Sequence, residues 1–265
     1  MSLSTVGQRA EDVITSKAEE DHAGLPAAFP GAALALFGAC IATRIPALGD
    51  LAPYNKARGF NLNDRDVLTD IVGFYDDAGI RPAVEVCEPD TSEHLDGLLR
   101  DADFSPAASG VTLHIAPERS PADEVAGLEI HEVAADSRGG YIALLLEAYE
   151  LPPSALAQRR MFAHEHAAPG LRCYLAVIDG VTAAAAALYI QGGTGLFVGA
   201  ATLPAFRRRG CQSALITRRL TDAAVDSDLV AVTAAAGTAS HDNLARHGFA
   251  TAHHRTLWQR SDTAL

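Results

Sequence analysis

The 265-residue sequence lacks most of the signatures that would assign a function class at once. With a formal net charge of −12 it has no basic excess, which excludes a typical nucleic-acid-binding surface and favours encounter with cationic substrates such as amines. The longest apolar run, 32–42, is too short to cross a bilayer and predicts a buried strand. The four cysteines have no paired spacing, which excludes a disulfide framework or zinc site and favours reduced thiols in a cytoplasmic protein.

Two common nucleotide-binding motifs are absent as well. No Gly-x-Gly-x-x-Gly follows a strand, which excludes a dinucleotide-binding fingerprint, and there is no Gly-x4-Gly-Lys-Ser/Thr loop. The polar residues 1–28 contain neither a signal peptide nor a membrane-spanning run, and 11–21 predict a helix packed on the surface. Hydrophobic content of 48% and charged content of 20% are typical of a globular protein.

The most informative stretch is 194–224, a strand, a turn and a helix in succession. The apolar run 196–203 predicts a buried strand, which Pro204 ends. Leu215, Ile216 and Leu220 recur at helical spacing, so a helix follows from about Ser213. The turn between them holds three arginines and Gly210. A glycine turn that opens a helix presents unpaired backbone N–H groups at the positive end of the helix dipole, which favours phosphate. A merely solvated charged turn is the alternative.

This turn resembles the acetyl-CoA pyrophosphate loop of the GNAT superfamily of N-acetyltransferases, Gln/Arg-x-x-Gly-x-Gly/Ala. Arg207 and Gly210 match its first and fourth positions, whereas Gln212 stands where Gly or Ala is usual. A second stretch, 240–249, resembles the family's last helix and ends in Gly-Phe. The matched region, 127–260, covers roughly half of the chain.

The resemblance implies how acetyl-CoA is held. The backbone N–H groups of one run would bind the pyrophosphate: Arg208, Arg209, Gly210, Cys211, Gln212 and Ser213. A main-chain N–H of Ala200, Ala201 or Thr202, on the strand before the loop, would meet the thioester carbonyl. Asn243 either offers its amide to the cofactor or packs in the last helix. Cys211 is either a thiol activated by the helix terminus or a small apolar filler.

The order of predicted elements in 128–265, β-α-(α)-β-β-β-α-β-α-β, resembles a complete GNAT fold with a mixed sheet, an α/β or α+β architecture. Residues 29–116 predict strand, helix (64–77), strand, helix (92–101) and strand, like the later part of that fold without its loop. We therefore expect two tandem GNAT-like lobes, a polar extension (1–28) and a Pro- and Glu-rich linker (117–127).

The catalytic acid and base are not identified by the motifs. The family often carries a Tyr and an Asn near its last helix, where this sequence has Leu244 and Gly237. The nearest candidates are Tyr149 and Glu150 at the end of the helix 137–149, and the His-Glu-His group 164–166 in the segment 150–169 expected to line the acceptor groove. The histidines lack the i, i+4 spacing of a helical zinc pair, so we expect no metal.

These observations predict an N-acetyltransferase that moves an acetyl group from acetyl-CoA to a primary amine of a small molecule or peptide. A non-catalytic acyl-CoA sensor or interaction protein is the principal alternative, and a purely structural tandem domain is the third. We expect no nucleic-acid or membrane partner, and homo-oligomerisation stays open.

Overall fold

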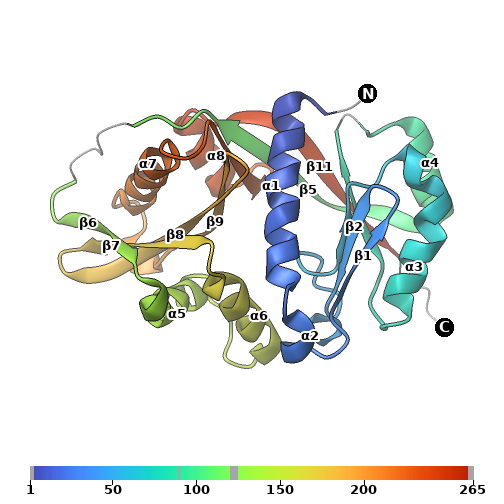
Figure 1. Ribbon diagram of the computed structural model, residues 1–265, viewed down its shortest axis with the longest axis horizontal. Coiled ribbons are helices and arrows are strands. Elements are labelled where there is room, and N and C mark those ends of the chain that lie inside the picture. The colour runs from blue at the N-terminus through green and yellow to red at the C-terminus, as the bar shows by residue number, and fades with distance from the viewer. Residues whose placement is uncertain (1–2, 89, 120–124, 262–265) are drawn as a thin grey trace.

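The computed structural model describes residues 3–88, 90–119 and 125–261 (Figure 1). The first half of the chain forms α1 (Thr5–His22), α2 (Leu25–Ala28), β1 (Ala33–Phe37), β2 (Cys40–Arg44), β3 (Lys56–Arg58), α3 (Leu68–Asp76), β4 (Ala83–Cys87), α4 (Glu93–Asp101) and β5 (Phe104–Ile115). The second half forms β6 (Leu128–Val133), α5 (Arg138–Ala148), α6 (Leu156–Ala167), β7 (Leu171–Ile178), β8 (Val181–Gln191), β9 (Thr194–Thr202), α7 (Cys211–Ala223), β10 (Leu229–Ala235), α8 (Ala239–Arg246) and β11 (Ala250–Arg260).

One eleven-stranded mixed sheet runs through both halves, in the order β1-β2-β3-β4-β11-β5-β10-β9-β8-β7-β6. Each half contains one parallel pair, β3 with β4 and β9 with β10. The last strand of each half lies against the parallel pair of the other, because β11 pairs with β4 and β5 pairs with β10. β5 and β11 also pair with each other in the centre. The two lobes therefore share their last strands.

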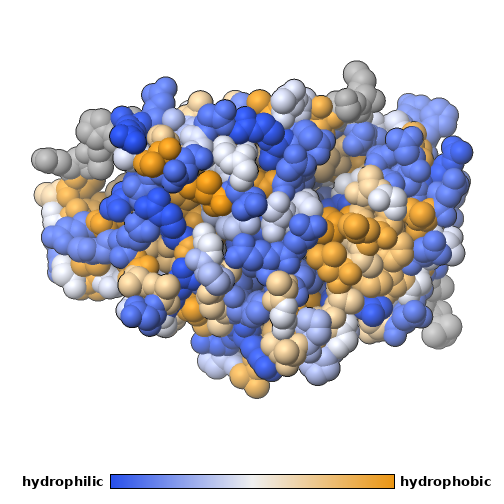
Figure 2. Space-filling view, in the orientation of Figure 1, coloured by the Kyte–Doolittle hydropathy of each residue, from blue (hydrophilic) through white to orange (hydrophobic). Residues whose placement is uncertain are grey.

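Helices cover both faces of the second lobe's sheet. Alternate residues of β8 point to opposite faces, as strand geometry requires: Ala184 and Leu188 join the core under α7 and α8, whereas Ala185 and Ala187 join the core under α1, α5 and α6. In the first lobe, α3 and α4 pack on β4, β5 and β11. Figure 2 shows an apolar area over the β1–β2 hairpin, where Leu36 is 70% exposed. No helix among the described residues is long and apolar enough to cross a membrane.

Several sequence predictions are confirmed. Asp179-Gly180, a pair that predicts a hairpin turn, joins β7 to β8, with both residues at positive φ. The helix expected at 92–101 is present as α4, which Ser92 caps by accepting a hydrogen bond from Leu95 N. The strand–turn–helix at 194–224 is present as β9, a short turn and α7. The linker 117–127 includes 120–124, which lie outside the described residues, and the domain boundaries stay a prediction.

Other predictions were wrong. Residues 32–42 form two strands, β1 and β2, because Gly38 at φ +59 turns the chain back within the apolar run. Residues 54–60, for which the sequence predicts a turn or short helix, contain β3. The segment 151–158, predicted as a loop or broken helix, includes the start of α6 at Leu156. The helix expected at 64–77, with Asn63 or Asp64 as its predicted cap, begins only at Leu68 as α3; Asn61 caps the 3-10 turn Leu62–Val67 that precedes it. Finally, α1 does not lie on the outside: Ala10 and Val13 are buried and the helix crosses the centre of the sheet (Figure 1).

Candidate active site

The site begins where β9 and β10 separate. The two strands pair in parallel over Thr194–Phe197 of β9 and no further, while β9 continues to Thr202 against β8. On that extension Gly199 and Ala200 together oppose the single residue Ala186 of β8, which is a β-bulge. A strand that leaves its neighbour and carries a bulge exposes main-chain groups that a ligand can reach.

Only glycine fits at the first bulge position. Gly199 has φ +48, and a Cβ there would overlap the imidazole of His166. That imidazole is buried between Tyr141, whose hydroxyl lies 2.9 Å from Nδ1, and the ring of Phe162 at 4.3 Å. Burial lowers the pKa of His166 to about 3, so the ring is neutral. His166 therefore supports the bulge as a packed neutral side chain.

The turn after β9 leaves the start of α7 open. Arg208 has φ +64 and Gly210 has φ +83, and Gly210 is the N-cap without a side-chain hydrogen bond. No acidic residue lies in the first turn. Among the described residues, the backbone N–H groups of Arg208, Arg209, Gly210, Gln212 and Ser213 find no acceptor, and that of Cys211 contacts only its own thiol. These free donors and the helix dipole together favour an anion.

A cleft of about 490 Å³ connects this turn with the bulge. Its described lining contains three arginines (Arg207, Arg208 and Arg246) and no carboxylate, although the whole chain carries a net charge of −12. A smaller cavity of about 150 Å³ continues from it between β9 and β10, sharing Tyr149, Ala200 and Asn243 with the cleft. The cleft is thus a cationic groove that ends at the separated strands.

Comparisons with known proteins agree on the architecture. No protein-family model matches the chain, and no curated protein matches its sequence. A solved GCN5-related N-acetyltransferase from Kribbella flavida is similar over 100% of this chain and 98% of its own, at 17% identity and TM-score 0.69. A tandem GNAT protein from the clavulanic acid biosynthesis pathway is similar over 91% and 86%, at 16% identity and TM-score 0.63. A functionally unknown conserved protein from Staphylococcus epidermidis is similar over 83% and 90%, at 13% identity and TM-score 0.62.

The chain has a tandem GNAT fold. The predicted GNAT resemblance and fold class are therefore confirmed. The roles of the predicted site residues stay predictions, and the structure gives their positions. Most of those predicted for the cofactor line the cleft: Ala200, Ala201, Thr202, Arg208, Gly210, Cys211, Gln212, Ser213 and Asn243. Arg209 does not, since its guanidinium lies 2.7 Å from Asp179 and stacks near Phe206.

Two residues of the loop after β9, Gln212 and Cys211, have a clear structural role. The unusual Gln212 turns its amide back to β9, where Nε2 donates to Thr202 Oγ1 at 2.9 Å and ties the helix start to the strand end. The Cys211 side chain is buried, and burial raises the pKa of its thiol. The activated-thiol alternative for Cys211 is therefore disfavoured, and the side chain acts as an apolar filler.

The candidate acid and base residues lie in different parts of the structure. Tyr149 lines both the cleft and the cavity between the strands, and its hydroxyl donates to Ala200 O at 3.1 Å. Burial raises the pKa of that phenol. Glu150 has φ +54, is exposed and lines neither of these cavities. Glu165 lies on α6 and faces a separate chamber.

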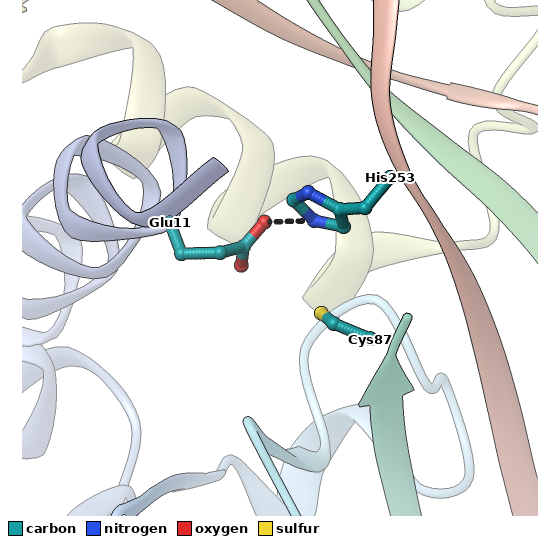
Figure 3. Close-up of side chains that lie close together, drawn as sticks. All are labelled: Glu11, Cys87 and His253. Atoms are coloured by element: carbon teal, nitrogen blue, oxygen red, sulfur yellow. Dashed lines mark hydrogen bonds and ion pairs between the residues drawn. The ribbon is translucent and has the colours of Figure 1, made fainter. Parts of the chain in front are cut away.

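One cluster has the composition of a metal site but not its electrostatics. Ligand atoms of Glu11, Cys87 and His253 lie within 4.8 Å of one another (Figure 3). However, Arg255 Nη2 lies 2.6 and 2.7 Å from the two Glu11 oxygens, so a fixed cation already occupies this carboxylate. Burial raises the pKa of the Cys87 thiol to about 12, which keeps it protonated. The cluster is better explained as the ion-pair network that attaches α1 to the sheet.

Several residues near the site carry no sequence signal. Arg219 of α7 is fully buried at the cavity between β9 and β10, where its guanidinium lies 3.8 Å from the Phe197 ring centroid. His22, Tyr54 and Arg58 come from the first half of the chain and line the chamber that Glu165 faces. Neither motif nor periodicity marks them, because their proximity to β9 depends on how the two lobes share the sheet.

Proposed function

We propose that the chain is an N-acetyltransferase that moves an acetyl group from acetyl-CoA to a primary amine by direct attack in a ternary complex. One observation carries the proposal. A single cleft joins the uncapped N-terminus of α7 to the bulged, separated end of β9. The GNAT fold and the location of this cleft within it support the assignment to acyl-CoA.

The lining of the cleft fits that substrate. Arg207, Arg208 and Arg246 offer positive charge to phosphate groups, and no described carboxylate opposes them. The uncapped start of α7 at Gly210 lies at the same end of the cleft. Small residues at the other end, Ala200 and Ala201, leave the strand backbone accessible to a narrow acyl-bearing chain.

When bound, acetyl-CoA supplies an electrophilic thioester carbonyl. In the proposed reaction the amine nitrogen forms a bond to the carbonyl carbon and the C–S bond breaks. The amine nitrogen gives up its excess proton and the departing thiolate takes one, so the products are an amide and free CoA thiol. The chain's part is to hold the reactants together and to offer a donor to the carbonyl oxygen from the backbone at the bulge.

Tyr149 is the described side chain best placed to protonate the thiolate. It lies where the cleft meets the cavity between β9 and β10, and its raised pKa keeps the hydroxyl protonated at neutral pH. Tyr149→Phe retains the ring contact with Phe162 and removes only the hydroxyl. We expect kcat to fall by roughly 10²–10⁴-fold, the range for a lost general acid, while CoA affinity stays the same.

The test is release of free CoA thiol from acetyl-CoA in the presence of a panel of primary amines. The proposal predicts amine-dependent thiol release with formation of the N-acetyl product. CoA binding without turnover of any amine would instead favour the acyl-CoA sensor. Neither binding nor turnover in a folded chain would leave the structural tandem domain.

A further inference from the structure

A separate chamber of about 170 Å³ lies on the face of β9 covered by α1 and α6. Phe197, Val198 and Thr233 line it and also line the small cavity between β9 and β10. The chamber therefore adjoins the small cavity that continues from the cleft where the strands separate. Its other walls come from α1, α6, β2, β3 and the loop before β3, so both lobes build it.

The charged groups of the chamber do not all neutralise one another. Lys17 and Asp21 of α1 form an ion pair, which cancels their charges. Arg58 of β3 and Glu165 of α6 remain, one cation and one acid. Neither forms an ion pair with a described residue; Arg58 acts on Glu85 only at longer range, and Glu85 already pairs with Lys56 and Arg255.

Two buried nitrogens at the chamber have no hydrogen-bond partner among the described residues. They are Arg58 Nη1 and His22 Nε2. The opposite ring nitrogen, His22 Nδ1, lies 2.7 Å from Ala18 O, which makes it the donor and leaves Nε2 as an acceptor in the neutral ring. Burial lowers the pKa of His22, which favours that neutral form. A buried donor without an acceptor is costly, so Arg58 Nη1 in particular requires an acceptor oxygen.

Glu165, in contrast to Arg58, requires a positively charged hydrogen-bond donor. Its only described hydrogen-bond partner is the Tyr54 hydroxyl at 3.5 Å, a weak contact. Burial, and secondarily Asp21, raise the pKa of Glu165 to about 8. A positively charged group in the chamber would give this carboxyl the partner that it lacks and return it to the ionised form.

We propose that this chamber is the acceptor site and that its substrate is a small amino-carboxylate such as an amino acid, with the amine at Glu165 and the carboxylate at Arg58. The inference rests on the proposed acetyl transfer and specifies its acceptor. It gives the first lobe a function, because Arg58 and Tyr54 both belong to it. A wider groove of about 440 Å³ adjoins the chamber at Pro53, Arg58 and Thr233 and leaves room for the acceptor's side chain.

The proton balance is consistent with this placement. The acceptor arrives as an ammonium group and must lose one proton before its nitrogen can attack. Glu165 in its ionised form accepts that proton and becomes a neutral carboxylic acid, which later releases the proton to solvent. His22 lies on the same wall, and its Nε2 is an acceptor without a described partner.

The test measures binding, so that it does not depend on turnover. Native chain saturated with CoA is titrated calorimetrically with L-threonine and other small amino acids, and with their decarboxylated counterparts such as 1-amino-2-propanol. We expect at least one amino acid to bind more tightly than its counterpart. Arg58→Gln should weaken the binding of that amino acid about 10- to 100-fold, the loss of one charge-assisted hydrogen bond, and reduce the preference over the amine.

Arg65→Gln is the matched control, because Arg65 lies in the same lobe with a side chain 67% exposed and should leave amino-acid binding unchanged. Equal binding of each amino acid and its amine, an Arg58→Gln variant that binds like the native chain, or no amino acid bound at millimolar concentration would each overturn the inference. These outcomes leave the proposed transfer intact if CoA still binds. If the native chain does not bind CoA at all, the proposed function is rejected separately.

Discussion

In each lobe a helix follows the first strand of the parallel pair, β3 or β9. The N-terminus of this helix is capped in the first lobe and uncapped in the second. In the first lobe, Asn61 caps a short helical turn (Leu62–Val67) that leads into α3, and its side chain accepts from Asn63 N at 2.9 Å. Asp64 completes a capping box and also accepts from Ala39 N at 2.9 Å. In the second lobe, α7 begins at Gly210 with no side-chain cap and no acidic residue in its first turn.

This difference shows how one fold gains or loses an anion site. In the first lobe a buried carboxylate of the chain itself occupies the positive end of the helix, so no ligand is needed there. In the second lobe the same kind of terminus is left unsatisfied and is surrounded by arginines. The strands differ as well: β3 is short and has no bulge, whereas β9 extends past its parallel partner and bulges at Gly199.

The largest expected effect comes from removing the bulge that only the second lobe has. In Gly199→Ala the new methyl group overlaps His166 and the residue keeps a left-handed φ. Overpacking and backbone strain together should lower the free energy of unfolding by about 2–5 kcal/mol and abolish transfer. Chemical denaturation measures the loss.

Gly139→Ala is the matched control, because Gly139 lies in α5 with open space where the new methyl group would lie. It should leave stability unchanged or raise it by up to about 1 kcal/mol, as alanine favours helix. A Gly199→Ala variant as stable and active as the Gly139→Ala control would contradict the role given to the bulge.

A smaller effect is expected from opening the helix start of the first lobe. Asp64→Ala removes the buried carboxylate that accepts from Ala39 N and Asn61 N, and leaves these two part-buried donors without it. We expect unfolding free energy to fall by about 1–3 kcal/mol. CoA affinity should not change, because the cleft is in the other lobe. Exposed Asp66→Ala serves as the control, and a loss of CoA affinity specific to Asp64→Ala would break the comparison.

A pH-dependent effect is expected at the chamber that the lobes share. Glu165 has a folded-state pKa raised from 4.5 to about 8, so its contribution to stability is present below about pH 4.5 and is lost as the pH rises through about 8. Lys17, Asp21 and His22 of α1 face it, with Tyr54 and Arg58 from the first lobe. Glu165→Gln imitates the protonated acid.

The melting temperature of Glu165→Gln minus that of the native chain should therefore increase as the pH rises from about 4.5 to about 8. Above about pH 8 this difference should stay constant. Parallel thermal melts across this range measure the difference. Glu147→Gln, an exposed change on α5, should follow the native chain at every pH. A constant offset for Glu165→Gln across the range would show that the carboxyl titrates normally.

Local chemistry made part of this structure predictable. The turn at Gly210 and the helix after it follow from one glycine, three arginines and a recurring apolar pattern, all close in sequence. The hairpin at Asp179-Gly180 likewise needs only two residues with positive φ. These features depend on neighbours along the chain, so a single sequence is sufficient for them.

The rest depends on contacts between distant residues. Periodicity contains no information on register, so the sharing of β5 and β11 between the lobes was not foreseen. The extent of α6 was not predicted, because Pro152-Pro153 indicated a loop or broken helix over 151–158 and its buried residues, such as Met161 and His166, form no regular stripe. The chamber joins positions 22, 58 and 165, which only the folded sheet brings together.

The most direct test of the central claim is thermal melting of the native chain, Gly210→Ala and Gly210→Glu with and without acetyl-CoA. Both variants carry the same backbone strain at φ +83 and the same contact with Val125, but only the second adds a carboxylate at the helix start, like the first lobe's Asp64. At about a hundred times its dissociation constant, acetyl-CoA should stabilise the native chain by roughly 2.7 kcal/mol, or several degrees at about 2–4 °C per kcal/mol. We predict that Gly210→Ala retains a shift and that Gly210→Glu shows none. No shift in the folded native chain, or equal shifts in all three proteins, would contradict an anion site at the start of α7.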